Sequence, residues 1–178
     1  MKTLILSSIL VVSLSADYFS KDQKEILNEA YNIGKQIKTA DGLSFENTLR
    51  SVAFSESSGG VYIVGDEHIT KDLAKASLGV YQVRVQTARE VIKKDKFMRE
   101  YFSYLLIDEK ALISMLLSKS KFGALVAGSY LKMRYNYALR KGIIKPWERA
   151  ISNYNGGNNN TTYINKIRKN MKLIKRNI

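Results

Sequence analysis

The chain has no cysteine, one histidine and one proline among its 178 residues. Without cysteine it forms neither a disulfide framework nor a thiolate metal site. The single histidine, His68, excludes metal sites built from several histidines and argues against a Ser-His-Asp triad. One proline and eleven glycines leave no proline-rich or glycine-rich linker. The sequence therefore predicts one domain, with no cofactor and no metal.

The N-terminal segment MKTLILSSILVVSLSA, residues 1–16, has one lysine, an apolar run over 4–14 and small residues at its end. This is the pattern of a secretory signal peptide. The apolar run is only about half as long as a membrane-spanning helix, which argues against an uncleaved anchor. We therefore expect an exported bacterial protein, periplasmic or extracellular, whose mature domain covers residues 17–178.

Basic residues outnumber acidic ones, and the net charge is +13. In an exported protein this excess favours an anionic neighbour: a cell wall, phospholipid headgroups or nucleic acid. The export signal argues against nucleic acid. The C-terminal segment is basic without a single acid, and it is either a solvated face or a contact with the wall or a membrane surface. Its basic residues are Lys166, Arg168, Lys169, Lys172, Lys175 and Arg176.

Apolar residues recur at helical spacing along most of the mature chain, which predicts a mostly helical α+β domain. One helix is expected within residues 17–42, and others over about 44–57, 87–95, 108–118, 120–140, 146–155 and from 161 onward. The segment VYIV, 61–64, is predicted as a small strand, and LGVYQVRV, 78–85, is strand-like.

Capping residues indicate where several of these helices begin. Asp41 or Ser44 is expected to cap the second helix, and Asp108 the helix that ends at residue 118. Thr87 and Glu90 have the spacing of a capping box. Pro146 suits the first position of a helix. The last helix is expected to be capped by Thr161 or Thr162.

A glutamate ends the apolar stripe of the second predicted helix. The stripe consists of Phe45, Leu49, Val52, Ala53 and Glu56, which share one helix face. Burial and a helix C-terminus both raise the pKa of a carboxyl, and a glutamate that stays protonated near neutral pH is suited to general acid catalysis. Alternatively, Glu56 turns to solvent at the helix end or pairs with a lysine, and spacing alone leaves the two readings equally open.

Four short motifs follow one another in the chain: Glu56-Ser57, GVYQVRVQTA at 79–88, GSYL at 128–131 and SNYNGG at 152–157. In this order they resemble the lytic transglycosylases of the goose-type lysozyme superfamily, over about residues 40–165. Departures are Val-Tyr in place of Leu-Met before Gln82, Ser152 in place of alanine, a longer segment from Glu56 to Gln82, and no Asn-Pro after the first motif. The resemblance implies a lysozyme-like single domain with a small β element between helices.

The resemblance also implies an activity: non-hydrolytic cleavage of the β-1,4 bond between N-acetylmuramic acid and N-acetylglucosamine in peptidoglycan, leaving 1,6-anhydro ends. Glu56 would act first as acid and then as base. The substrate contacts implied by the motifs are Ser57, Gln82, Tyr130, Tyr154 and Asn155. Tyr130 and Tyr154 also fit helical stripes of core residues, so packing alone is the competing interpretation for both.

Two other functions stay open. Asp66 or Glu67 would activate water if the protein were a hydrolytic lysozyme. A non-enzymatic basic protein that binds the wall or, peripherally, a membrane surface would use the exposed lysines and leave Glu56 incidental. If the chain is a transglycosylase, its small size resembles that of specialised enzymes that open the wall for secretion, pilus or conjugation machines.

Overall fold

The computed structural model describes residues 17–66 and 71–178. The expected signal peptide, Glu67 and His68 lie outside the described residues. In chain order the elements are α1 (Lys21–Gln36), α2 (Glu46–Ser57), β1 (Ser77–Leu78), β2 (Val83–Arg84), α3 (Val85–Lys94), α4 (Lys96–Phe102), η1 (Ser103–Leu106), α5 (Glu109–Ser118), α6 (Ser120–Arg140), α7 (Pro146–Tyr154) and α8 (Thr161–Asn177).

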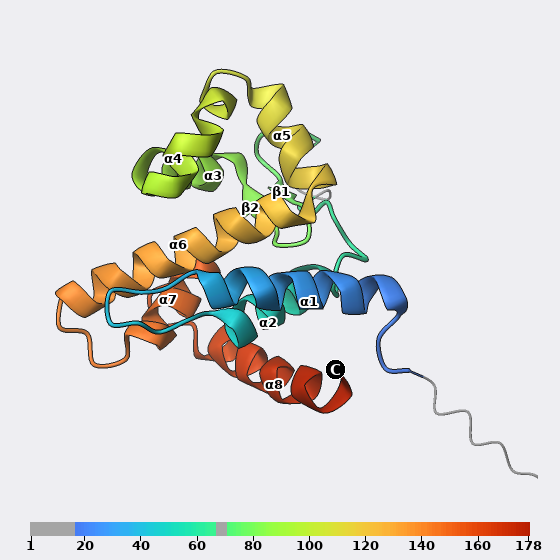
Figure 1. Cartoon of the computed structure of the whole chain (residues 1–178), viewed down its shortest axis with the longest axis vertical. Helices are drawn as coiled ribbons and strands as arrows, with labels where there is room; N and C mark the ends of the chain where they lie inside the picture. Colours follow the sequence, from blue (N-terminus) through green and yellow to red (C-terminus); the bar gives the residue numbers. More distant parts are fainter. Residues whose placement is uncertain (1–16, 67–70) are drawn as a thin grey trace, which may run out of the picture.

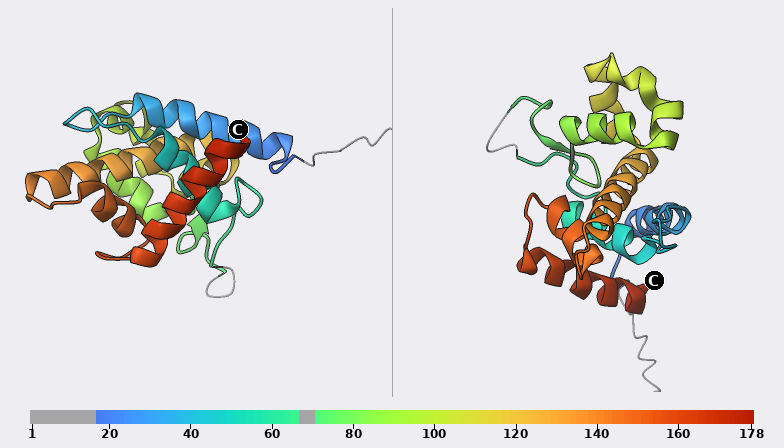
Figure 2. Two further views of the ribbon diagram at one scale, coloured as in Figure 1. Left: turned by 90° about the horizontal axis from the view of Figure 1, so that it is seen from below. Right: turned by 90° about the vertical axis from the view of Figure 1, so that its left-hand side faces the viewer.

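The long helix α6 separates two groups of helices (Figure 1). On one side α1 packs on both α2 and α6, α2 packs on α8, and α7 packs on α6 and α8. On the other side α3, α4, η1 and α5 contact one another and form a smaller lobe. The right-hand view of Figure 2 shows the same division, with residues 58–66 and 71–76 along one side of the molecule.

The mostly helical α+β fold class is confirmed, with one antiparallel two-stranded sheet, β1–β2, among the described residues. The predicted strand at 61–64 is wrong. Only Val64 makes a bridge, to Leu78, and the side chains of Val61, Tyr62 and Ile63 are largely exposed. Backbone hydrogen bonds from Gly65 to Ser77 and from Gly79 to Ile63 flank this bridge, so only the end of the segment pairs with β1 and its start stays irregular.

Several helix starts agree with the sequence. Asp108 caps α5 by accepting a hydrogen bond from the Ala111 amide, and Pro146 opens α7. The predicted capping box at Thr87 is wrong: α3 begins two residues earlier because the chain passes directly from β2 into the helix. Arg84 occupies the N-cap position there without a side-chain hydrogen bond.

The caps expected for the second and last helices are also wrong. Phe45 is the N-cap residue of α2; its ring is buried in the core and makes no capping hydrogen bond. At α8 the side chain of Asn160 accepts a hydrogen bond from the Tyr163 amide, so the cap lies one residue before the predicted Thr161.

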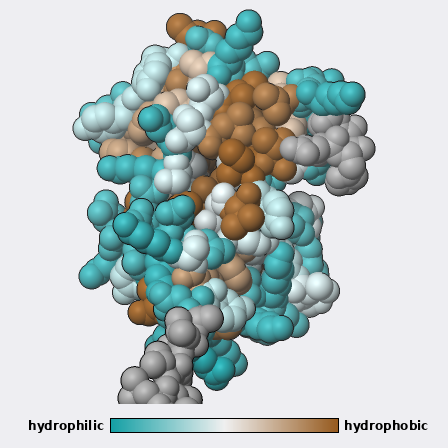
Figure 3. All heavy atoms as spheres, turned by 90° about the vertical axis from the view of Figure 1, so that its right-hand side faces the viewer, coloured by the Kyte–Doolittle hydropathy of each residue, from teal (hydrophilic) through white to brown (hydrophobic). Residues whose placement is uncertain are grey.

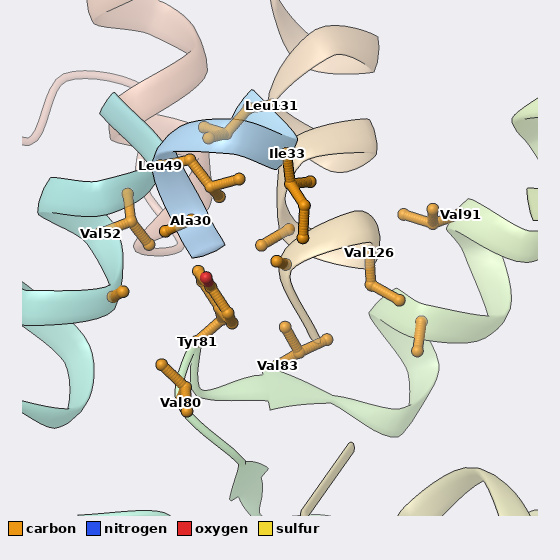
Figure 4. Packing of buried hydrophobic residues seen from close by; sticks show 14 of the residues in the cluster. Ala30, Ile33, Leu49, Val52, Val80, Tyr81, Val83, Val91, Val126 and Leu131 are labelled. Carbon is orange, nitrogen blue, oxygen red and sulfur yellow. The ribbon is translucent and has the colours of Figure 1, made fainter. Parts of the chain in front are cut away.

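The core fills the space between the hairpin and helices α1, α2, α3 and α6. Tyr81 reaches from the hairpin turn into this space, where Ala30 and Ile33 of α1 meet Leu49 of α2 (Figure 4). The stripe predicted for the second helix is confirmed, since Phe45, Leu49, Val52 and Ala53 are all fully buried. This burial anchors α2 and so determines where its C-terminal end lies.

No single helix among the described residues has both the length and the apolar composition needed to cross a membrane. Helices α5 and α6 reach that length and composition only together, and the chain bends by 101° between them.

Helices α1 and α2 approach each other very closely at Gly34. A Cβ atom added to this glycine would lie 2.7 Å from the Cα of Glu46 and 2.8 Å from its amide nitrogen. Both atoms belong to the backbone at the start of α2, so they can move aside only if the helix moves. A glycine is required here by the short distance between the two helices.

We expect Gly34→Ala to lower the free energy of unfolding by about 1–3 kcal/mol, because overpacking shifts a helix backbone. Urea denaturation followed by circular dichroism measures the change. Gln36→Ala, at an exposed position of the same helix, is the control and is expected to stay within about 0.5 kcal/mol of the unmodified protein. Equal stabilities of the two variants would contradict this account of the α1–α2 contact.

Candidate functional site

A cavity of ≈ 460 Å³ lies where the C-terminal end of α2 meets the β-hairpin, α6 and the end of α7. Four of the five substrate-contact residues expected from the sequence line it, together with the expected acid. These lining residues are Glu56, Gln82, Tyr130, Tyr154 and Asn155. They come from segments up to 99 positions apart in the chain, so only the tertiary structure brings them together.

Glu56 lies one helical turn beyond the buried residues of α2, so its side chain follows their direction and is half-buried beside the cavity. Burial raises the pKa of its carboxyl. A hydrogen bond from the Tyr163 hydroxyl and the charge of Lys166 lower the pKa, but the effect of burial is larger. The protonated form of Glu56 is therefore favoured relative to a glutamate in water.

Helix α2 ends immediately after Glu56. Ser58 adopts the left-handed conformation with φ 55°, and Gly59 and Gly60 follow with φ 70° and 94°. The Gly59 amide donates to the carbonyl of Ala53, which closes the helix end. The helix therefore ends where the sequence predicts, with Ser58 as the first residue outside it.

Ser57 contributes to this helix end. It is 1% exposed, its hydroxyl donates to the carbonyl of Ala53 at 3.0 Å, and it accepts a hydrogen bond from the Gly60 amide at 2.8 Å. Ser57 therefore holds the end of the helix and is not among the residues that line the cavity, so the structure gives no support to the substrate contact expected for it.

Gln82 lies in the hairpin turn with φ 48°, a strained value for a residue with a side chain. Its backbone amide and its side-chain amide both donate to the carbonyl of Gly79, at 3.1 and 2.9 Å. These two hydrogen bonds stabilise the turn and hold the side chain at the cavity wall. Strained residues concentrate at functional sites, which is consistent with the role expected for Gln82.

Tyr130 of α6 and Tyr154 of α7 form one wall of the cavity. Their rings are 5.9 Å apart and nearly perpendicular. The Tyr154 hydroxyl donates to the carbonyl of Tyr81 at 2.7 Å, and burial, followed by the charge of Glu56, raises the pKa of this hydroxyl. Both tyrosines therefore line the cavity and pack against the core, and the substrate contact expected for them stays a prediction.

Asn155 is the next residue after α7 and is exposed at the mouth of the cavity. Its side-chain oxygen accepts a hydrogen bond from the Asn160 amide at 2.8 Å. Because Asn160 also caps α8, this bond connects the cavity rim to the start of that helix.

Asp66 is a second carboxylate on the cavity, which its sequence context did not indicate. It accepts a hydrogen bond from the Ser77 hydroxyl at 2.9 Å and lies 3.4 Å from the Arg84 guanidinium. The hydrogen bond from Ser77, followed by the charge of Arg84, lowers the pKa of Asp66. The cavity thus has two carboxyl groups whose pKa values shift in opposite directions. Active sites that use one carboxyl as an acid and another as a charged group have the same property.

Tyr163 was not predicted as a site residue, although it donates its hydroxyl hydrogen bond to Glu56. It lies in α8, 107 positions after the glutamate, and no local pattern distinguishes it from a core tyrosine. It reaches Glu56 because α8 packs along α2, where Lys166 and Asn170 hydrogen-bond to the carbonyl and hydroxyl of Ser55. The basic helix therefore supports the candidate acid.

In the ranges 17–66 and 71–178, no three histidine, aspartate or glutamate side chains form a group able to hold a metal ion. The chemistry offered by the described cavity is that of two carboxyl groups, phenol hydroxyls and amides.

Comparisons of the chain with protein-family models, curated proteins and solved structures found no match. The functional argument therefore depends on the residues of the cavity and on the motif resemblance.

The hydrogen bond from Tyr163 opposes the effect of burial on the pKa of Glu56. Tyr163→Phe removes the donor and keeps the ring, so we expect the pKa of Glu56 to rise further. NMR titration of the Glu56 side-chain carboxyl in the two proteins measures the difference. Tyr104→Phe, at an exposed tyrosine outside the cavity, is the control and leaves this pKa unchanged. An unchanged or lower pKa in Tyr163→Phe would show that the hydroxyl does not stabilise the charged form.

Proposed function

We propose that the protein is a peptidoglycan lytic transglycosylase with a lysozyme-like fold. The observation on which this proposal rests is that the motif segments at 56–57, 79–88 and 152–157 meet at one cavity, where burial favours the protonated form of Glu56. A fourth segment, GSYL at 128–131, contributes Tyr130 to the same cavity. A chance resemblance in short motifs gives no reason for their side chains to meet.

In the proposed reaction Glu56 donates its proton to the oxygen of the bond between N-acetylmuramic acid and N-acetylglucosamine, and the C1–O4 bond breaks. The N-acetyl group of the substrate helps to stabilise the oxocarbenium-like cation. The ionised Glu56 then accepts the proton of the C6 hydroxyl while the C1–O6 bond forms. Glu56 is protonated again at the end, and no water is consumed.

The neighbours of Glu56 suit both of its roles. Burial favours the acid before cleavage, and the Tyr163 hydroxyl with the charge of Lys166 stabilises the carboxylate that follows. Gln82 and Asn155 supply amide groups, and Tyr130 and Tyr154 supply ring surface for a sugar. Export through residues 1–16, a periplasmic or extracellular location and work beside a secretion, pilus or conjugation machine belong to the same proposal.

Glu56→Gln is expected to reduce the release of muropeptides from purified sacculi by about 10²–10⁴-fold, because the amide cannot donate a proton as an acid. Mass spectrometry of the products measures release and distinguishes 1,6-anhydro ends from reducing ends. Glu25→Gln, at an exposed glutamate of α1, makes the same chemical change outside the cavity and keeps full activity. Full activity of Glu56→Gln would remove this residue from the mechanism.

A hydrolytic lysozyme is the second candidate, and the location of Asp66 favours it. One carboxyl of lowered pKa and one of raised pKa on the same cavity is the arrangement in which the first activates water or stabilises the cation while the second donates a proton. The products decide between the two functions, because hydrolysis leaves reducing ends.

If the protein is a transglycosylase, Asp66→Asn keeps 1,6-anhydro muropeptides as the products, even where the rate falls because contacts with Ser77 and Arg84 weaken. The measured quantity is the ratio of anhydro to reducing ends, which does not depend on how much active protein is present. Reducing ends formed by the unmodified protein and lost in Asp66→Asn would instead assign hydrolysis, with Asp66 as the base.

A further inference from the structure

A second cavity, of ≈ 360 Å³, lies on the same side of α6 as the first. Its walls come from α3, the start of α4 and the C-terminal half of α6. None of the sequence motifs falls within it, and the proposed cleavage reaction does not use it.

The two cavities follow one another along the same two helix faces. On α6, Val126 and Tyr130 line the first cavity, and Arg134 and Tyr137 line the second. These residues recur every three or four positions, so they share one face of the helix. On α3, Thr87 lines the first cavity and Glu90 and Lys94 the second, again at helical spacing.

Arg134 lies at the junction of the two cavities. Its guanidinium stacks over the ring of Tyr130 at 4.7 Å and donates two hydrogen bonds to the Glu90 carboxylate, at 3.1 and 3.2 Å. Tyr130 belongs to the first cavity, so this contact connects the walls of both. The two cavities are therefore neighbours along the contact between α3 and α6, on either side of Arg134, and we call them together the α3–α6 groove.

The second cavity is strongly basic. Five basic side chains face two acidic ones, an excess of three positive charges; the basic residues are Lys94, Lys96, Lys132, Arg134 and Arg140. Glu90 is shared by Lys94 and Arg134, and Asp95 pairs with Lys132. Within the part of the chain that the structure describes, Lys96 and Arg140 have no acidic partner. Two cations at this end of the groove are thus free to bind an anion.

We propose that this basic end of the groove binds a carboxylate of the peptide stem attached to the glycan that occupies the first cavity. The inference rests on the proposed function and specifies its substrate: glycan strands that carry peptides. Tyr130 and Arg140 are ten residues apart on α6, about 15 Å along the helix axis. An anion bound by Lys96 and Arg140 would therefore lie beside the sugars in the first cavity. In peptidoglycan, the negative groups next to the sugars are the carboxylates of the peptide stems.

Lys96→Gln/Arg140→Gln removes both unpaired cations and tests the inference. We expect this double variant to raise the KM for soluble peptide-bearing glycan strands about fivefold to tenfold, the effect of losing two exposed charge contacts. The KM for strands whose peptides have been removed by an amidase serves as the reference, and the ratio of the two KM values is the measured quantity. Lys110→Gln/Lys121→Gln, at two exposed lysines outside both cavities, is the matched control and keeps the ratio of the unmodified protein.

An equal change in KM for both kinds of strand, or no change for either, would overturn the inference while leaving the transglycosylase proposal intact. If the unmodified protein cleaves neither strand, the proposed function fails, and a binding measurement decides about the groove.

That measurement titrates the protein calorimetrically with a soluble disaccharide-peptide and with the same disaccharide without its peptide. Tighter binding of the disaccharide-peptide, with the difference abolished in Lys96→Gln/Arg140→Gln, supports a stem-binding groove independently of catalysis. Equal affinities, a difference that persists in the variant, or absence of binding for both ligands overturns it.

Discussion

The burial of one face of α2 is the constraint on which the candidate site depends. Helix α1 contacts the start of α2 closely enough to require Gly34, and α8 packs along its length. With the helix held from both sides, its last turn has a single position, and Glu56 continues the direction of the buried stripe. The residues that hold α2 in place thereby set both the location and the protonation preference of this carboxyl.

The surroundings of the two carboxyl groups on the cavity shift their pKa values in opposite directions. Glu56 is half-buried beside the cavity and receives one hydrogen bond from a phenol, and burial has the larger effect on its pKa. Asp66 lies on the more open hairpin side, where a serine hydroxyl and a guanidinium favour its charged form. An acid and a charged group beside one cavity suit the cleavage of a glycosidic bond, and whether Asp66 takes part separates the two candidate reactions.

Polarity is unevenly distributed over the molecule. On the face shown in Figure 3 a continuous hydrophobic area covers part of the upper half, which contains α3 to α5, while the lower half is largely hydrophilic. Basic side chains gather instead at the far end of the α3–α6 groove and on the exposed face of α8. The overall positive charge is therefore partly organised around the proposed substrate groove, and α8 uses its other face to support Glu56.

The sequence by itself determined the helices, the buried stripe of α2 and the presence of a carboxyl at its end, because helical periodicity is a local property. It also indicated Gln82, Tyr130, Tyr154 and Asn155 through short motifs. Only the tertiary structure decided that Ser57 faces inward, that Asp66 reaches the cavity, and that Tyr163 contacts Glu56 from 107 positions away. These outcomes depend on how helices and loops pack against one another. No local sequence pattern at Ser57, Asp66 or Tyr163 encodes that packing.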